Sequence, residues 1–162
     1  MTKKWSNTVL VAFSALPKIV KELDFAFNSR LKSSFGSIHL KNGVSTLKLV
    51  EEMVEINSYK SRLALLKVCV CAALERLSAD ERGVLTARII EKKTFQEISD
   101  MSGMSLRTVF RKFDRAQENF AKALSLQGLD EEAYLLHYDR IPALRAVSER
   151  LVGETYFVAK SN

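Results

Sequence analysis

The residues best suited to binding chemistry lie on one predicted helix that starts near residue 105. Arg107 and Arg111 are four positions apart, so they share one face of that helix. This face is flanked by hydroxyl, basic and apolar side chains: Thr108, Lys112, Arg115, Leu106 and Phe110. Guanidinium groups fit guanine edges, hydroxyl and ammonium groups bind phosphates, and apolar groups contact the thymine methyl. The pattern predicts a helix that reads the major groove of DNA.

The opposite side of the same helix is apolar. Val109, Phe113, Ala116 and Phe120 recur at three- and four-residue spacing and form one stripe. We expect this stripe to pack on the preceding helices, which leaves the basic face in solvent.

Two capping boxes mark the helices that must position this face. Ser78 with Glu81, and Thr94 with Glu97, each place a hydroxyl and a carboxylate where they satisfy the unpaired amides at a helix start. They predict helices over residues 79–91 and 95–101.

Gly103 predicts the turn that follows. Glycine adopts the left-handed conformation without a Cβ penalty, and Ser105 caps a third helix that runs to about Gln127. Two helices joined by a short turn that contains glycine form a helix-turn-helix. Amides at the start of the 95–101 helix provide a second place for a phosphate. The predicted DNA-binding residues are therefore Thr94, Gln96, Ser105, Leu106, Arg107, Thr108, Phe110, Arg111, Lys112 and Arg115.

The rest of the chain also has helical periodicity, so the predicted fold class is all-α. Before the motif we expect helices over 5–15 and from Pro17 to about 31, a loop over 33–43 with room for a short strand at 38–40, and a helix over 45–77 that can bend near Asn57. After it we expect helices over 130–140 and from Pro142 to a stop at Gly153.

Three segments follow from this organisation. They are a basic N-terminal helical module at 1–73, the helix-turn-helix domain at 74–127 and a C-terminal helical extension at 128–162. The C-terminal helices are expected either to pack on the long third helix or to form a homodimer contact. Two-fold pairing doubles the few base pairs that one small module reads.

Composition excludes several classes of protein. Apolar residues make up 47% of the 162 residues, enough for a core, while 6 Gly and 2 Pro exclude a collagen-like or disordered chain and argue against a turn-rich all-β fold. The net charge of +6 suits a polyanionic partner. No apolar run approaches the roughly 18 residues of a membrane helix. The apolar run at 9–13 is interpreted as a buried first helix rather than a signal peptide, so we expect a cytoplasmic protein that binds no membrane.

An enzyme is the function that the sequence supports least. Cys69 and Cys71 are two residues apart and point to nearly opposite sides of a helix. Neither His39 nor His137 belongs to a recognisable catalytic or metal-binding set, and no phosphate-binding loop or dinucleotide fingerprint occurs. We therefore expect no catalytic residue, no metal and no cofactor.

A larger set of residues between 74 and 116 follows a family pattern. Its members are Leu74, Leu77-Ser78, Glu81-Arg82, Val84-Leu85, Thr94 to Ser99, Gly103-Met104-Ser105, Thr108-Val109, Phe113 and Arg115-Ala116. The segment resembles region 4 of bacterial sigma factors, and the extracytoplasmic-function type most. The resemblance covers about a third of the chain. It implies DNA contacts through Arg107, Thr108, Arg111, Lys112 and Arg115, and it aligns the helix over 79–91 with the part that meets RNA polymerase.

The chain departs from this family in two respects. Ser99 and Ser102 stand where the family has Ala and Leu, so we expect looser packing at the turn. The residues before the motif do not resemble region 2, which melts the promoter in complete sigma factors, and a further tail follows the motif. This layout is similar to the small sigma-like regulators of bacterial phages and mobile elements.

Three functions remain open at this point. The first, which we favour, is a sequence-specific transcription regulator that binds double-stranded DNA, with or without RNA polymerase core as a partner. The second is a DNA packaging or recombination accessory protein of a phage or mobile element, which would form a ring or larger oligomer. The third is a helical protein-interaction module, which would show no salt-dependent binding to DNA.

Overall fold

The computed structural model describes residues 3–36 and 46–159 (the side chains of 5–33 and 46–150), and every regular element in these ranges is a helix. The elements are α1 (Lys3–Gly36), α2 (Thr46–Glu75), α3 (Ala79–Ile89), α4 (Phe95–Ser102), α5 (Leu106–Leu126), α6 (Glu131–His137) and α7 (Pro142–Ala159). The all-α prediction is confirmed. The predicted strand at 38–40 and His39 lie outside the described residues. None of the described helices is long and apolar enough to cross a membrane.

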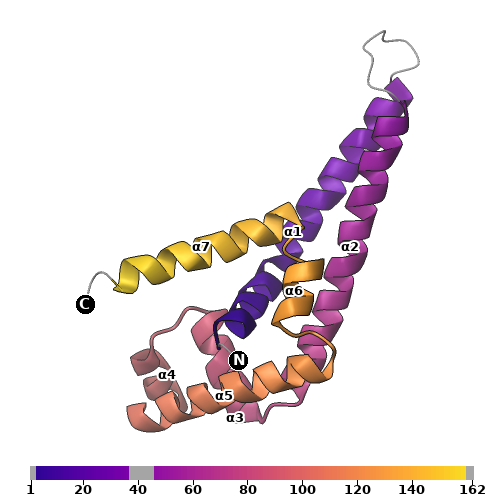
Figure 1. Cartoon of the computed structure of the whole chain (residues 1–162). Coiled ribbons are helices and arrows are strands. Elements are labelled where there is room, and N and C mark those ends of the chain that lie inside the picture. The colour runs from indigo at the N-terminus through magenta and orange to yellow at the C-terminus, as the bar shows by residue number, and fades with distance from the viewer. Residues whose placement is uncertain (1–2, 37–45, 160–162) are drawn as a thin grey trace.

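Helices α1 and α2 lie side by side as a long antiparallel hairpin (Figure 1). α1 continues through Pro17, so the predicted break into two shorter helices is wrong. A proline inside a helix removes one backbone donor and crowds the preceding turn. Leu16 and Ile19, on either side of it, are each 5% exposed, and their burial outweighs this local cost. α2 likewise runs without interruption through Asn57.

One hydrophobic core joins this hairpin to the second half of the chain. Leu10 of α1, Leu66 of α2, Phe120 of α5 and Leu144 of α7 are all fully buried and belong to the same cluster. Burying a side chain of this size contributes about 1.5–3 kcal/mol. The core therefore runs through all three segments of the sequence.

The C-terminal helices pack mainly against α1. The expectation that they pack on the long third helix is corrected by these contacts, although Tyr134 and Ile141 enter a core to which both α1 and α5 contribute. The alternative, a homodimer contact, stays a prediction. α6 ends at His137, earlier than predicted. α7 continues beyond Gly153, where a stop was predicted, because one glycine weakens a helix by about 1 kcal/mol but does not by itself end it.

A second, smaller cluster holds α3, α4 and α5 together. Val84, Ile98 and Val109 are buried at its centre, with Phe95 and Phe113 packed against it. Together with the larger core, this cluster buries the predicted apolar stripe of α5. The three helices are therefore fixed relative to one another and to the hairpin.

Replacing Val109 with aspartate is expected to unfold the three-helix unit. Val109 is fully buried, so the new carboxylate would lose its hydration without gaining a partner. We expect a loss of about 3 kcal/mol or more in the free energy of unfolding, measured by urea titration with circular dichroism. Lys122→Asp, at an exposed position of the same helix, is the control. An unfolding midpoint equal to that of the wild type would contradict this packing.

Stability is also expected to fall at high pH because of Tyr134. Burial raises the pKa of this phenol from 10.0 to about 12, and its ring stacks on Tyr138 with centroids 5.6 Å apart. The folded state holds the proton more tightly, so above pH 10 the unfolded chain ionises first and is favoured. Urea titrations from pH 9 upward should show the free energy of unfolding falling until about pH 12. Over this range the wild type should lose more free energy of unfolding than Tyr134→Phe. Equal losses would contradict the raised pKa of Tyr134.

Candidate nucleic-acid interface

The helices that carry the candidate site begin at the predicted caps. The Ser78 hydroxyl accepts from the Glu81 amide at 3.2 Å, and the Glu81 carboxylate accepts from the Ser78 amide at 3.2 Å. The same two bonds join Thr94 and Glu97. The Thr94 hydroxyl accepts from the Glu97 amide at 3.2 Å, and the Glu97 carboxylate accepts from the Thr94 amide at 2.6 Å. Both capping boxes are confirmed, and they satisfy amides that would otherwise be unpaired at the starts of α3 and α4.

The turn between α4 and α5 has the geometry expected of a helix-turn-helix. Gly103 ends α4 with a φ of 66°, in the left-handed region that favours glycine. The buried Ser99 hydroxyl donates to the Met104 carbonyl at 2.6 Å, and the Ser102 hydroxyl donates to the Ile98 carbonyl at 2.6 Å. The two serines that depart from the family pattern thus make hydrogen bonds within α4 and across the turn.

The start of α5 presents most of the predicted contact residues to solvent. The Ser105 hydroxyl caps the helix by accepting from the Thr108 amide at 3.3 Å. Thr108 and Lys112 are half-buried. The exposed members of the predicted set on this helix are Ser105, Leu106, Arg107, Phe110, Arg111 and Arg115. α3, α4 and α5 gather at the end of the molecule where α1 begins and α2 ends (Figure 1).

Arg107 and Arg111 differ from the other basic residues of this face. Both are exposed, and neither forms an ion pair with any residue in the described part of the chain. One helical turn separates them, so the two guanidinium groups lie on the same side of α5. They are free to form bidentate hydrogen bonds with a ligand.

Lys112 and Arg115 are instead held by α3. The Lys112 ammonium pairs with the Asp80 carboxylate, and Arg115 Nε lies 3.4 Å from Glu81 Oε1. Glu81 is only 9% exposed and also accepts from the Asn119 amide at 3.0 Å. These acids attach the outer side of α5 to the start of α3. This role of Asp80 and Glu81 was not predicted, because no local pattern links residues more than thirty positions apart.

An aromatic cluster supports the other flank of α5. The Phe95 ring lies 4.4 Å from Phe110 and 5.2 Å from Phe113, between ring centroids, and the Arg88 guanidinium lies 4.8 Å from the Phe95 centroid. Phe110 is still 45% exposed. Its ring is therefore held by α4 on one side and open to a ligand on the other. Neither Phe95 nor Arg88 was among the predicted DNA-binding residues.

The predicted phosphate contacts at the start of α4 are already engaged within the helix. The Thr94 hydroxyl and amide bond with Glu97, and the Gln96 amide group donates to Asp100 at 2.9 Å. The hydrogen bonds from Thr94 hold the pKa of Glu97 below its usual range. A carboxylate at this helix start occupies the place that a phosphate would take.

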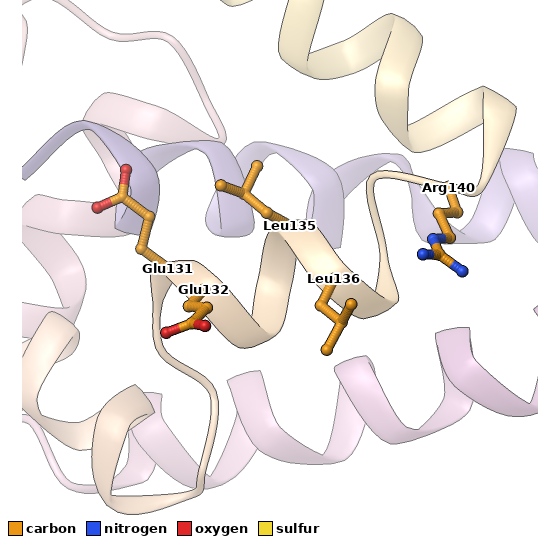
Figure 2. Close-up of a pocket in the computed structure, with 5 residues that line it drawn as sticks. All are labelled: Glu131, Glu132, Leu135, Leu136 and Arg140. Carbon is orange, nitrogen blue, oxygen red and sulfur yellow. The ribbon is translucent and has the colours of Figure 1, made fainter.

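A shallow hollow of the described surface lies along α6 and the turn that follows it, away from these residues in sequence. It is lined by Glu131, Glu132, Leu135, Leu136 and Arg140 (Figure 2). The two carboxylates lie at one end and the guanidinium group at the other, with the two leucines between them. Polar groups that do not converge on one point are a poor arrangement for catalysis.

Comparison with known families agrees with this geometry. Residues 73–118 match the model of the family described as sigma-70, region 4. The match takes in α3, α4 and the first part of α5, which is the whole helix-turn-helix and its predicted contact face. No curated protein and no solved structure matches the chain. This family consists of DNA-binding domains rather than enzymes. Residues 73–118 are therefore a helix-turn-helix domain of the sigma-70 region 4 family.

Proposed function

We propose that the protein is a sequence-specific regulator of transcription that places the start of α5 in the major groove of DNA. The observation that carries this proposal is the pair Arg107 and Arg111, exposed and unpaired on a helix whose opposite side is buried. A rigid helix with two free guanidinium groups one turn apart suits the recognition of guanine edges.

The neighbouring residues take complementary roles. Leu106 and Phe110 are half-exposed apolar groups beside the arginines, suited to a thymine methyl. Ser105 and Thr108, at the first turn, are within reach of the DNA backbone once the helix is seated. Thr94 and Gln96 would bind a phosphate only by exchanging their present partners within α4.

Lys112 and Arg115 are proposed to combine two functions. Their ion pairs with Asp80 and Glu81 orient α5, and their charges also attract the DNA backbone. Because a phosphate must compete with an existing carboxylate partner, each contributes less to affinity than a free cation would. We assign them to phosphates rather than to bases.

RNA polymerase core is the proposed protein partner, on the strength of the family match. In this proposal α3 faces polymerase while α5 faces DNA. Transcription by RNA polymerase is measured with and without the protein, on a template that carries the DNA site selected from random duplexes. This experiment tests the polymerase contact separately from DNA binding.

Removal of either free arginine is expected to reduce sequence-specific binding. Arg107→Ala and Arg111→Ala should each cost about 1–3 kcal/mol on the preferred site and relax its sequence preference. The site would first be selected from random duplexes, and affinities then measured by fluorescence anisotropy. Lys122→Ala, an exposed cation on the later part of α5, is the matched control. Unchanged affinity and preference in both arginine variants would refute this contact face.

The Lys112–Asp80 pair predicts opposite effects of two substitutions. Lys112→Ala should weaken all duplexes alike and lower the slope of log affinity against log salt by about one. Asp80→Asn removes the competing carboxylate, so it should strengthen binding to all duplexes without changing the preferred sequence. Salt titrations of binding to the selected site and to a random duplex measure both effects. If Asp80→Asn binds DNA more weakly at unchanged stability, the Lys112–Asp80 pair acts by holding α5 in position rather than by competing with phosphate.

A further inference from the structure

Lys92 has an unusual backbone conformation in the turn between α3 and α4. Its φ is 57°, and no other residue of the described part of the chain has a positive φ unless it is a glycine. A residue with a Cβ is strained in this left-handed region, which glycine adopts without cost. Strained residues concentrate at functional positions, where the side chain itself is needed. The lysine therefore requires an explanation other than the folding of the turn.

Hydrogen bonds to the next residue hold Lys92 in this conformation. The Lys93 amide donates to the Ala87 carbonyl at 3.0 Å. The Lys93 carbonyl accepts from Arg88 Nη1 at 2.9 Å. Both backbone groups of Lys93 are thus bound to α3, and the turn cannot relax without breaking these bonds.

The ammonium group of Lys92 has no partner among the residues that the structure describes. Its side chain is exposed and forms neither an ion pair nor a hydrogen bond with any of them. The adjacent Glu91 carboxylate is already paired, since Lys93 Nζ lies 2.5 Å from Glu91 Oε2. The charge of Lys92 is therefore available to an external anion.

The turn lies beside the flank of α5 that carries Phe110. The Arg88 guanidinium lies 4.8 Å from the Phe95 centroid, and the Phe95 ring lies 4.4 Å from that of Phe110. Lys92 precedes Phe95 by three residues, so at most ~11 Å separates their Cα atoms. Phe110 is next to Arg111 in sequence, on the exposed part of α5. Lys92 is thus placed close to the proposed contact face.

The two flanks of α5 differ in charge. On one flank the carboxylates of Asp80 and Glu81 pair with cations of α5, among them Lys112. Phe110 is two positions before Lys112, about 200° around the helix axis, so the turn with Lys92 lies on the other flank. The major groove is only about 12 Å wide, so a helix seated in it has a phosphate backbone along each side. The turn faces one of these two backbones.

We propose that Lys92 binds a phosphate of the DNA backbone when α5 enters the major groove. This inference rests on the proposed function and extends its contact surface to the turn before α4. Lys92 supplies there the phosphate contact that Thr94 and Gln96 do not offer while they are bound within α4. A lysine is then retained at a position that suits glycine because its charge contributes to binding.

The variant Lys92→Gly separates this role from a structural one, because it removes the charge and also relieves the strain. The midpoint of its urea unfolding should equal or exceed that of the wild type. Its affinity for all duplexes should fall roughly fivefold or more at about 0.1 M salt, and the slope of log affinity against log salt should fall by about one. Lys92→Asn, which also tolerates this conformation, should lose the same affinity, while Lys92→Arg should bind like the wild type.

Lys48→Ala is the matched control for net charge. It removes an exposed lysine near the start of α2, at the end of the hairpin away from the helix-turn-helix domain (Figure 1). Its affinity and salt slope should remain those of the wild type. An equal loss in Lys48→Ala and Lys92→Gly would overturn the contact, because net charge alone would then explain both.

Neutral phosphates locate the contact on the DNA. Single phosphates of the duplex selected from random sequences are replaced in turn by methylphosphonates, and the affinities of the wild type and Lys92→Gly are compared. At one position the replacement should weaken binding of the wild type and leave that of Lys92→Gly unchanged. Identical profiles for the two proteins would rule out a phosphate bound by Lys92.

The outcomes also distinguish this inference from the proposed function. If Lys92→Gly binds like the wild type while Arg107→Ala loses the selected site, the proposed function stands and the phosphate contact does not. Lys92→Gly with a lower urea midpoint and unchanged binding would assign Lys92 to the end of α3, where a cation is favourable. A wild type that binds no duplex would overturn both.

Discussion

The candidate site depends on the burial of one side of α5. Val109 anchors the start of this helix in the small cluster with α3 and α4, and Phe120 anchors its later part in the main core. Gln117 adds a hydrogen bond of 3.0 Å to Asn7 of α1. A helix held at so many points cannot turn about its axis. The direction in which Arg107 and Arg111 point is therefore set by the whole fold.

Local patterns were sufficient to predict the helix-turn-helix. Each capping box spans four residues, and the glycine turn and the apolar stripe are equally short-range, so their geometry follows from the adjacent sequence. The exposure of Arg107 and Arg111 followed from the same periodicity. The family pattern was visible for the same reason, since its anchors are these caps and buried positions.

Long-range packing could not be predicted in this way. Pro17 is a local signal to start a helix, yet burial of its neighbours keeps α1 continuous. Lys112 and Arg115 were predicted only as DNA contacts, because their partners on α3 are distant in sequence. In each case the missing information was which surfaces meet in space.

Two of the four cations on the proposed contact face of α5 are paired within the protein and two are not, and this difference has an evolutionary consequence. Lys112 and Arg115 bind carboxylates of α3, so changing them disturbs the position of the helix. Arg107 and Arg111 bind nothing in the described part of the chain, so they can be exchanged at little cost in stability. In the proposed function, new target sequences can therefore arise by substitution at these two positions alone, and related chains that share this fold can diverge rapidly in the sites they read.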